Sequence, residues 1–276
     1  MLRRFSQVDV FTDTPYAGNP LAVVVDGDGL STEAMQRFAS WTNLSETTFL
    51  LRPRRAQADY RVRIFTTQSE LPFAGHPTLG SCHVWLAAGG VPKSAPQLVQ
   101  ECEAGLIPLH ASGDRLAFAA PPLVRSGPPE PSLVEHVAAV LDIERADIVD
   151  AEWADNGPGW LAVLLENAEA VLAVRPRSVD LDLGVVGAYP PGSPAAFEIR
   201  AFFPKDGSTV EDPVTGSLNA SVAQWLIRSG RATPPYTVAQ GTALGRLGRV
   251  EISTDETGKV WVGGRTITCI SGSVDL

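Results

Sequence analysis

Hydrophobic and polar residues alternate with two different periods along the first hundred positions. Four segments rich in β-branched and aromatic residues predict strands, at 5–12, 21–27, 46–51 and 60–66. Residues 31–43 predict a helix with Ser31 as candidate N-cap. Within residues 76–90 a second helix is predicted, in which apolar residues recur at helical spacing from Leu79 until the helix stops at Gly89-Gly90. The alternation predicts a mixed α/β (α+β) fold.

Two segments, half the chain apart, contain the same order of elements. Residues 63–90 and 200–230 each contain an Arg-x-Phe strand, a loop, a proline turn, a Gly-Ser pair, an apolar helix and a closing glycine. When the proline turns are aligned, His76-Pro77 falls on Asp212-Pro213, and Gly80-Ser81 falls on Gly216-Ser217 at the same offset. A weaker match relates AGNPLAVVV to GPGWLAVLL. The repeat predicts a domain duplication with two pseudo-symmetric lobes.

The boundary between the lobes is expected in a proline-rich segment. Residues 121–132, PPLVRSGPPEPS, contain five prolines and read as a linker. We therefore predict an N-terminal lobe at 1–124 and a C-terminal lobe at 125–276. Whether the final strand returns to the first lobe is left open.

Composition and charge narrow the class of partner. The chain has 276 residues, is 44% hydrophobic, and has a formal net charge of -9. That charge argues against binding to nucleic acids or anionic membranes, and favours a small molecule. The apolar runs are too short to span a bilayer. Three cysteines without a CxxC pair favour the reducing cytoplasm, and four scattered histidines predict no metal site.

The sequence EDPVTGS, residues 211–217, is a candidate site. By itself it reads as a turn before a helix N-terminus. Its counterpart in the other copy contains His76, so the two turns together supply a histidine, an aspartate and a serine. A helix N-terminus also offers unpaired N–H donors and partial positive charge, which suit a carboxylate or an enolate. We expect both turns to line one active site between the lobes.

Five ordered motifs resemble a known family. They are GNPLAVV at 18–24, SETTF at 45–49, ELPFAGHPTLG at 70–80, EDPVTGS at 211–217 and Gln240-Gly241. In this order they resemble the phenazine-biosynthesis isomerase (PhzF-like) family, which has the diaminopimelate-epimerase fold. The resemblance implies a cofactor-free isomerase, commonly a homodimer. It also implies that each lobe is a curved, barrel-like sheet around a central helix.

The resemblance also implies roles for individual residues. In the founding activity a glutamate moves a proton along the ring of a dihydro-hydroxyanthranilate, and that glutamate corresponds to Glu46. His76, Asp212 and Ser217 correspond to the groups that hold the substrate, a small carboxylate, and assist the proton transfer. Further substrate-binding candidates are Asn19, Gly75, Pro77, Thr215, Gly216 and Gly241. The segment GRLGRV at 245–250 departs from the family pattern and suggests a changed substrate.

The residues themselves leave local alternatives open. Glu46 could act as the base that a carbon acid needs, or could be a solvated or capping carboxylate. His76, between Gly75 and Pro77, is expected in a loop, where a histidine suits acid–base work. Asp212 could equally cap the following helix or take part in catalysis. Asn19, on local grounds alone, reads as a turn residue.

Other classes of function remain as alternatives. Ser217, His76 and Asp212 have the residue types of a hydrolase triad, but no G-x-S-x-G motif surrounds the serine. A two-thiol racemase is disfavoured because neither matched turn contains a cysteine. The segment GDGLST lacks the third glycine of a dinucleotide-binding motif. A noncatalytic small-molecule-binding protein is the remaining alternative.

Overall fold

The computed structural model describes residues 1–276, and the chain divides into two compact units. The first unit contains Met1–Ala119 together with Gly263–Leu276, and the second contains Ala120–Val262. The predicted boundary after residue 124 lies between the strand β8 (Arg115–Ala119) and the helix α3 (Pro131–Leu141). Each unit is described by itself.

The first unit is a closed barrel of eight strands. Its strands are β1 (Leu2–Val10), β2 (Asn19–Val24), β3 (Thr47–Leu51), β4 (Tyr60–Phe65), β5 (Glu70–Leu71), β6 (Gln97–Cys102), β7 (Gly105–Ser112), β8 (Arg115–Ala119) and β16 (Val260–Asp275). The order is β1-β2-β3-β4-β6-β7-β8-β16, and β16 pairs back with β1. The short strand β5 pairs with β4 outside this ring.

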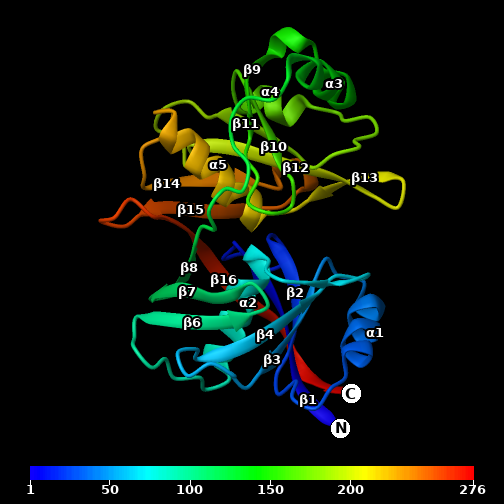
Figure 1. The fold of residues 1–276 in the computed structure, drawn as a ribbon, viewed down its shortest axis with the longest axis vertical. Helices are drawn as coiled ribbons and strands as arrows, with labels where there is room; N and C mark the ends of the chain where they lie inside the picture. Colours follow the sequence, from blue (N-terminus) through cyan, green and yellow to red (C-terminus); the bar gives the residue numbers. More distant parts are fainter. The chain divides into compact units, whose positions relative to one another are not determined.

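The helix α2 (Gly75–Ala87) is the central helix of the barrel (Figure 1). Most of its residues are buried, and its close packing depends on Gly80. A Cβ atom at Gly80 would lie 2.5 Å from Leu21 Cδ2, so glycine allows the helix to approach β2. Gly80 thus serves the packing of α2 against the barrel.

The helix α1 (Thr32–Thr42) covers the outside of the barrel and confirms the predicted segment and cap. Ser31 Oγ accepts a hydrogen bond from the Ala34 N–H at 3.2 Å. Asn43 ends the helix in the left-handed region, with a φ of 56°. The buried face of α1 packs through Met35 and Phe38 in a cluster with aromatic side chains of β3 and β4.

The second unit has a mixed sheet, with both parallel and antiparallel strand pairs, around its own central helix. Its strands are β9 (Ile148–Trp153), β10 (Leu161–Leu165), β11 (Leu183–Ala188), β12 (Phe197–Lys205), β13 (Ser208–Asp212), β14 (Tyr236–Gln240) and β15 (Gly248–Thr254). Its helices are α3 (Pro131–Leu141), α4 (Ala168–Ala173) and α5 (Gly216–Arg228), with 3-10 segments at Arg145–Asp147 and Thr242–Leu244. The sheet order is β15-β14-β12-β11-β10-β9, with β13 paired to β12. Like α2, α5 is largely buried.

The two central helices show that the duplication has a different register from the predicted one. Both have 13 residues, and both end with the same pattern of cap bonds. Superposing their first residues pairs Gly75 with Gly216 and His76 with Ser217. The alignment of His76 with Asp212 was therefore wrong. Phe202 pairs with Glu211 in the β12–β13 hairpin, and Phe65 pairs with Glu70 in the β4–β5 hairpin. The chain between the paired residues is longer in the β12–β13 hairpin, and this insertion displaced the alignment.

A repeated ion pair marks the same hairpin in both units. The guanidinium of Arg63 donates two hydrogen bonds to the Glu70 carboxylate, each at 2.6 Å. Arg200 donates two to the Glu211 carboxylate, at 2.9 and 2.8 Å. Each pair joins the long strand to the short strand that leads into the central helix. The pairs therefore fix the turn at the start of α2 and of α5.

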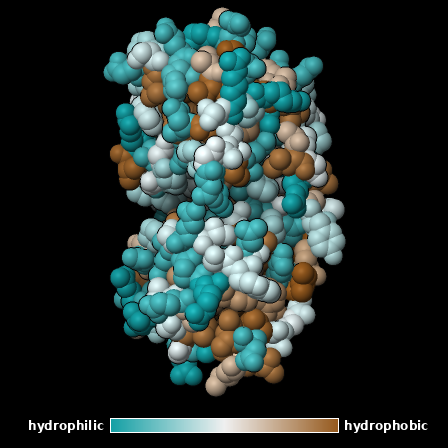
Figure 2. Space-filling view, turned by 90° about the vertical axis from the view of Figure 1, so that its right-hand side faces the viewer, coloured by the Kyte–Doolittle hydropathy of each residue, from teal (hydrophilic) through white to brown (hydrophobic).

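The surface carries both hydrophilic and hydrophobic residues. Figure 2 shows them interspersed over the face it displays. No helix combines the length and the apolar character needed to cross a membrane.

Candidate functional site

His76 lies in the first turn of α2, and the expectation of a loop position is corrected. Helix α2 starts at Gly75, and the preceding Ala74 makes no side-chain cap. Pro77 is the third residue of the helix, where its missing N–H breaks no helical hydrogen bond. The short Gly-His-Pro sequence thus begins the central helix, and His76 is only 5% exposed.

Two side chains of the same unit contact the two nitrogens of the His76 ring. Asn19 Nδ2 lies 3.4 Å from Nδ1, and Glu46 Oε2 lies 3.3 Å from Nε2. Nε2 makes no directed hydrogen bond, although it is buried. Because an amide nitrogen donates, the Asn19 contact favours the tautomer with its proton on Nε2, which faces Glu46. The structure thus brings together three of the predicted site residues.

Burial keeps the His76 ring neutral. It lowers the pKa of His76 from 6.5 to about 3, because the charged imidazolium would lose its hydration. A neutral imidazole can donate one hydrogen bond through its protonated nitrogen. His76 is therefore suited to donate a hydrogen bond toward Glu46 or a ligand at neutral pH.

Asn19 is held by a tight turn before β2. The Gly18 N–H donates to Asp9 Oδ2 at 3.0 Å. A Cβ atom at Gly18 would lie 2.3 Å from the Val10 carbonyl oxygen, so only glycine fits. Asn19 itself is the first residue of β2 and is fully buried, with its amide on His76. It orients the histidine, a role that its reading as a turn residue did not include.

Glu46 lies immediately before β3, in the connection from α1. Its side chain is 16% exposed, and its Oε2 atom, which lies against His76, is buried. A partly buried carboxylate beside a neutral histidine is an arrangement that can accept or deliver a proton.

In the second unit, Asp212 and Thr215 belong to a hydrogen-bonded network ahead of α5. Asp212 is the last residue of β13, and its Oδ2 accepts a hydrogen bond from Thr215 Oγ1 at 2.6 Å. The N-cap residue of α5 is Thr215, which makes no side-chain cap bond. Asp212 is thus not the N-cap residue that one local alternative proposed.

Gln240 and Asn219 complete this network, and sequence reasoning did not assign them. Gln240 Oε1 accepts from the Thr215 N–H at 3.0 Å and from Asn219 Nδ2 at 2.7 Å. Gln240 Nε2 donates to Thr215 Oγ1 at 2.9 Å and to the Asp212 carbonyl oxygen at 3.2 Å. The fully buried amide of Gln240 therefore fixes the turn that carries Asp212. The Gln-Gly motif was the only signal for it in the sequence.

Two residues that the sequence analysis missed contact Ser217, the second residue of α5. Trp160 Nε1 donates to Ser217 Oγ at 3.0 Å, and Asn156 Nδ2 donates to the Ser217 carbonyl oxygen at 2.9 Å. Both belong to the loop between β9 and β10. Gly216 begins α5 directly before Ser217.

The backbone conformation at position 241 explains why this residue is glycine. Its φ is 85°, a region that favours glycine, and a Cβ atom would lie 2.6 Å from the Pro213 carbonyl oxygen. Gly241 therefore supports the turn from Asp212 to Thr215.

Two of the three cysteines are poorly suited to thiol chemistry. Burial raises the pKa of Cys82 to about 12, and it also raises the pKa of Cys102. The thiolate is the reactive form, so these cysteines are inert at neutral pH. No group of three or more His, Cys, Asp or Glu side chains is arranged to hold a metal ion.

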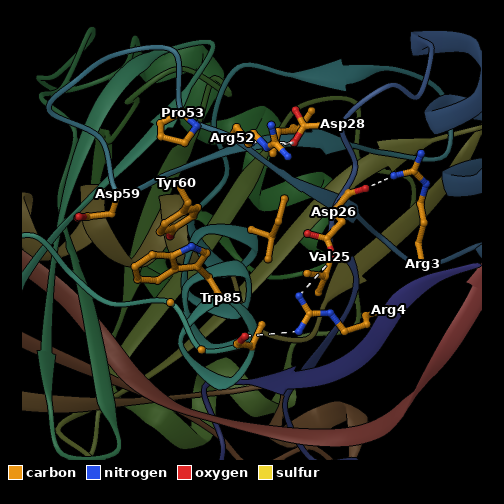
Figure 3. A pocket seen from close by; sticks show the side chains of 15 residues that line it. Arg3, Arg4, Val25, Asp26, Asp28, Arg52, Pro53, Asp59, Tyr60 and Trp85 are labelled. Carbon is orange, nitrogen blue, oxygen red and sulfur yellow. Dashed lines mark hydrogen bonds and ion pairs between the residues drawn. The ribbon is translucent and has the colours of Figure 1, made fainter.

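A cavity of about 520 Å³ lies at the other end of α2 from His76, beside Trp85 and Ala88 (Figure 3). Its charged lining is largely paired within the protein. Arg4 contacts the Asp26 carboxylate at 3.3 Å and the Ala88 carbonyl oxygen at 3.4 Å. Since charges here neutralise one another and the Glu46–His76 pair lies elsewhere, we assign the candidate active site to the start of α2.

Comparison with known proteins identifies the family. The family model described as phenazine biosynthesis-like protein (PhzC-PhzF) matches residues 8–272. The chain belongs to this family. The trans-2,3-dihydro-3-hydroxyanthranilate isomerase of Pseudomonas aeruginosa is 34% identical, over 94% of this chain and 92% of its own length. A Schizosaccharomyces pombe relative named antisense-enhancing sequence 1 is 37% identical, over 97% of each chain.

Solved structures show the same fold for the PhzC-PhzF family. A PhzF-family protein of Bacillus anthracis matches with a TM-score of 0.83 over 100% of both chains, at 21% identity. A hydroxyproline epimerase of Agrobacterium vitis matches with a TM-score of 0.59 at 13% identity, over 99% of this chain and 92% of its own. The predicted fold, two similar α/β lobes of epimerase type, is confirmed.

Proposed function

We propose that this protein is an isomerase that moves a carbon-bound proton on a small carboxylate substrate, with Glu46 as the general acid/base. The contact of 3.3 Å between Glu46 Oε2 and His76 Nε2 at the start of α2 carries the proposal. The relatives named as dihydro-hydroxyanthranilate isomerases support the reaction class. We propose a reaction similar to theirs. The experiment below is designed to identify the substrate.

Each residue near Glu46 has a role in this proposal. Glu46 takes the proton from one carbon and returns it to another, and neutral His76 donates a hydrogen bond that stabilises the intermediate charge. Asn19 keeps the histidine in the required tautomer. Gly75 and Pro77 place His76 at the start of α2. A proton shift of this kind works with these groups alone, so we propose that no cofactor takes part.

In the second unit, the start of α5 is proposed to bind a carboxylate group. Ser217 and the N–H groups of Gly216 and Ser217 offer hydrogen-bond donors at the start of α5, where partial positive charge favours a carboxylate. Asp212, linked to Thr215, is proposed to accept a hydrogen bond from a substrate hydroxyl or amine. Gly241 would then act only through the turn it supports.

The hydrolase alternative has less support from the geometry. In a catalytic triad, one histidine nitrogen faces the serine and the other faces the aspartate. In this protein the two nitrogens of His76 face Asn19 and Glu46. The carboxylate of Asp212 accepts from Thr215, the wrong partner for a triad.

Proton NMR in deuterated water tests the proposal. A panel of cyclic and amino-acid-like carboxylates, including dihydro-hydroxyanthranilate, is incubated with wild type and with Glu46→Gln. We expect wild type to place deuterium at a substrate carbon and Glu46→Gln to be slower by about 10²–10⁴-fold. Glu33→Gln, on the exposed surface of α1, is the matched control and keeps full activity.

The possible outcomes separate the alternatives. Equal exchange by Glu46→Gln and wild type would remove Glu46 from the mechanism. If wild type binds a ligand without deuterium exchange, and Glu46→Gln still binds that ligand, a noncatalytic binding protein would be favoured. Acylation of Ser217 by a serine-directed reagent would favour a hydrolase.

We also propose that the protein works as a homodimer in the cytoplasm, as the resemblance and the cysteine content suggest. Light scattering after size-exclusion chromatography tests the first point, since a particle mass equal to that of one chain would contradict it.

A further inference from the structure

The β9–β10 loop holds Ser217 at two points. Trp160 donates from its indole N–H to the hydroxyl oxygen at 3.0 Å, while Asn156 donates to the carbonyl oxygen at 2.9 Å. Trp160 is 4% exposed and directly precedes β10. One loop therefore fixes both the side chain and the backbone of a residue proposed to touch the substrate.

The loop is itself rigidly bonded. Asp155 Oδ1 accepts from the N–H groups of Gly157 and Gly159, at 2.7 and 2.8 Å. The Ala154 N–H donates to the Trp160 carbonyl oxygen at 3.0 Å, which closes the loop. These bonds hold the indole in place before any ligand arrives.

We propose that Trp160 is a positioning residue that makes Ser217 a hydrogen-bond donor to the substrate. An indole N–H can only donate, so the contact uses a lone pair of the Ser217 oxygen. The hydroxyl hydrogen then points elsewhere, and the Ser217 hydroxyl donates no hydrogen bond within the protein. It is free to bond an oxygen atom of a substrate carboxylate or carbonyl. This inference rests on the proposed function, since it concerns how that substrate is held.

The first unit contains a counterpart of this arrangement. His76 occupies the same position in α2 as Ser217 in α5, and Asn19 at the start of β2 bonds its ring. In the repeated sequences that begin β2 and β10, Trp160 falls on Pro20, so Asn19 lies one position before the match of Trp160. In both units a side chain from the start of this strand orients the second residue of the central helix.

A double-mutant cycle tests whether Trp160 acts through the Ser217 hydroxyl. Trp160→Phe removes the indole N–H but keeps an aromatic ring, and we expect it to raise KM about tenfold with a smaller change in kcat. Ser217→Ala should raise KM at least as much. The double variant should then be no worse than Ser217→Ala. Trp153→Phe, on β9 of the same unit, is the control and leaves KM unchanged.

An unchanged KM in Trp160→Phe would overturn the proposal. So would additive losses in the double variant, because they would mean that the indole acts independently of the hydroxyl.

A second measurement does not depend on activity. The chain has six tryptophans, so ¹⁵N labelling gives six indole N–H resonances, and Trp160→Phe identifies the one from Trp160. We expect this resonance to shift upfield in Ser217→Ala, where its acceptor is absent, while the Trp153 resonance stays in place. An unmoved Trp160 resonance would overturn the inference. Absence of exchange by wild type across the substrate panel would count against the proposed function alone.

Discussion

The charge state of His76 is a property of a single residue that determines its chemistry. A histidine in a loop, as expected from the sequence, would titrate near pH 6.5. In the structure it is buried in the first turn of α2, and its pKa falls to about 3. The ring is therefore a neutral hydrogen-bond donor beside Glu46, and a nitrogen so weakly basic is a poor proton acceptor at neutral pH.

This shift predicts a dependence of stability on pH. Between about pH 3 and 6.5 the unfolded chain binds a proton at His76 that the folded protein does not bind. The ionisation of His76 therefore leaves the stability of the fold unchanged above pH 6.5 and lowers it progressively as the pH falls toward 3. We expect His76→Gln to lose less stability than wild type between pH 7 and pH 5 in urea unfolding. NMR titration of the ring provides the check, and a midpoint near 6.5 would contradict the assignment.

The site residues themselves were only partly predictable. Glu46, His76, Asp212 and Ser217 lie in motifs, so a resemblance could point to them. Trp160 lies in no motif and contacts Ser217, 57 residues away, whereas Gln240 lies in the Gln-Gly motif but contacts Thr215, 25 residues away. Residue type alone gives no signal for such contacts.

At the scale of elements, the helices and strands were predictable because their hydrophobic periods are clear. The predicted helix with Ser31 as N-cap and the helix that follows EDPVTGS are both present. The register of the repeat was not predictable, because an insertion in a polar hairpin leaves no periodic signal. The Arg–Glu pairs of the two hairpins reveal the correct match.

The two Arg–Glu pairs differ in burial, so removing the arginine should lower the free energy of unfolding by different amounts. Arg200 and Glu211 are 5% and 11% exposed, whereas Arg63 and Glu70 are 18% and 24% exposed. Arg200 also donates to the carbonyl oxygens of Val171 and Val174. We expect Arg200→Met to lower the free energy of unfolding by about 3–5 kcal/mol, because it leaves Glu211 buried without its partner.

The matched variant at the other hairpin provides the comparison. Arg63→Met should cost less in urea unfolding, since water can reach Glu70 more easily. The double change Arg200→Met with Glu211→Leu should recover part of the loss. Equal costs for the two arginine variants would show that burial does not decide the strength of these pairs.

At the scale of the whole molecule, the path of the chain links the two units. The chain leaves the first unit after Ala119 and returns to it at Gly263. The strand β16 then closes the barrel between β8 and β1. The last residues of the sequence therefore complete the unit that contains Glu46 and His76, a connection that sequence patterns left open.

Two glycines of β16 allow this closure to be tested. A Cβ atom at Gly263 would lie 2.6 Å from the Leu116 carbonyl oxygen in β8, whereas a Cβ atom at Gly272 would meet nothing within 4 Å. We expect Gly263→Ala to lower the free energy of unfolding by about 1–3 kcal/mol, because the barrel must open locally to admit the methyl group. Gly272→Ala is the control and should be neutral or stabilising by up to about 1 kcal/mol. Hydrogen exchange should show lost protection in β1, β8 and α2 for Gly263→Ala, with α5 unchanged. An equal loss in α5 would show instead that both units unfold as one cooperative block, so that closure of the barrel stabilises the entire chain.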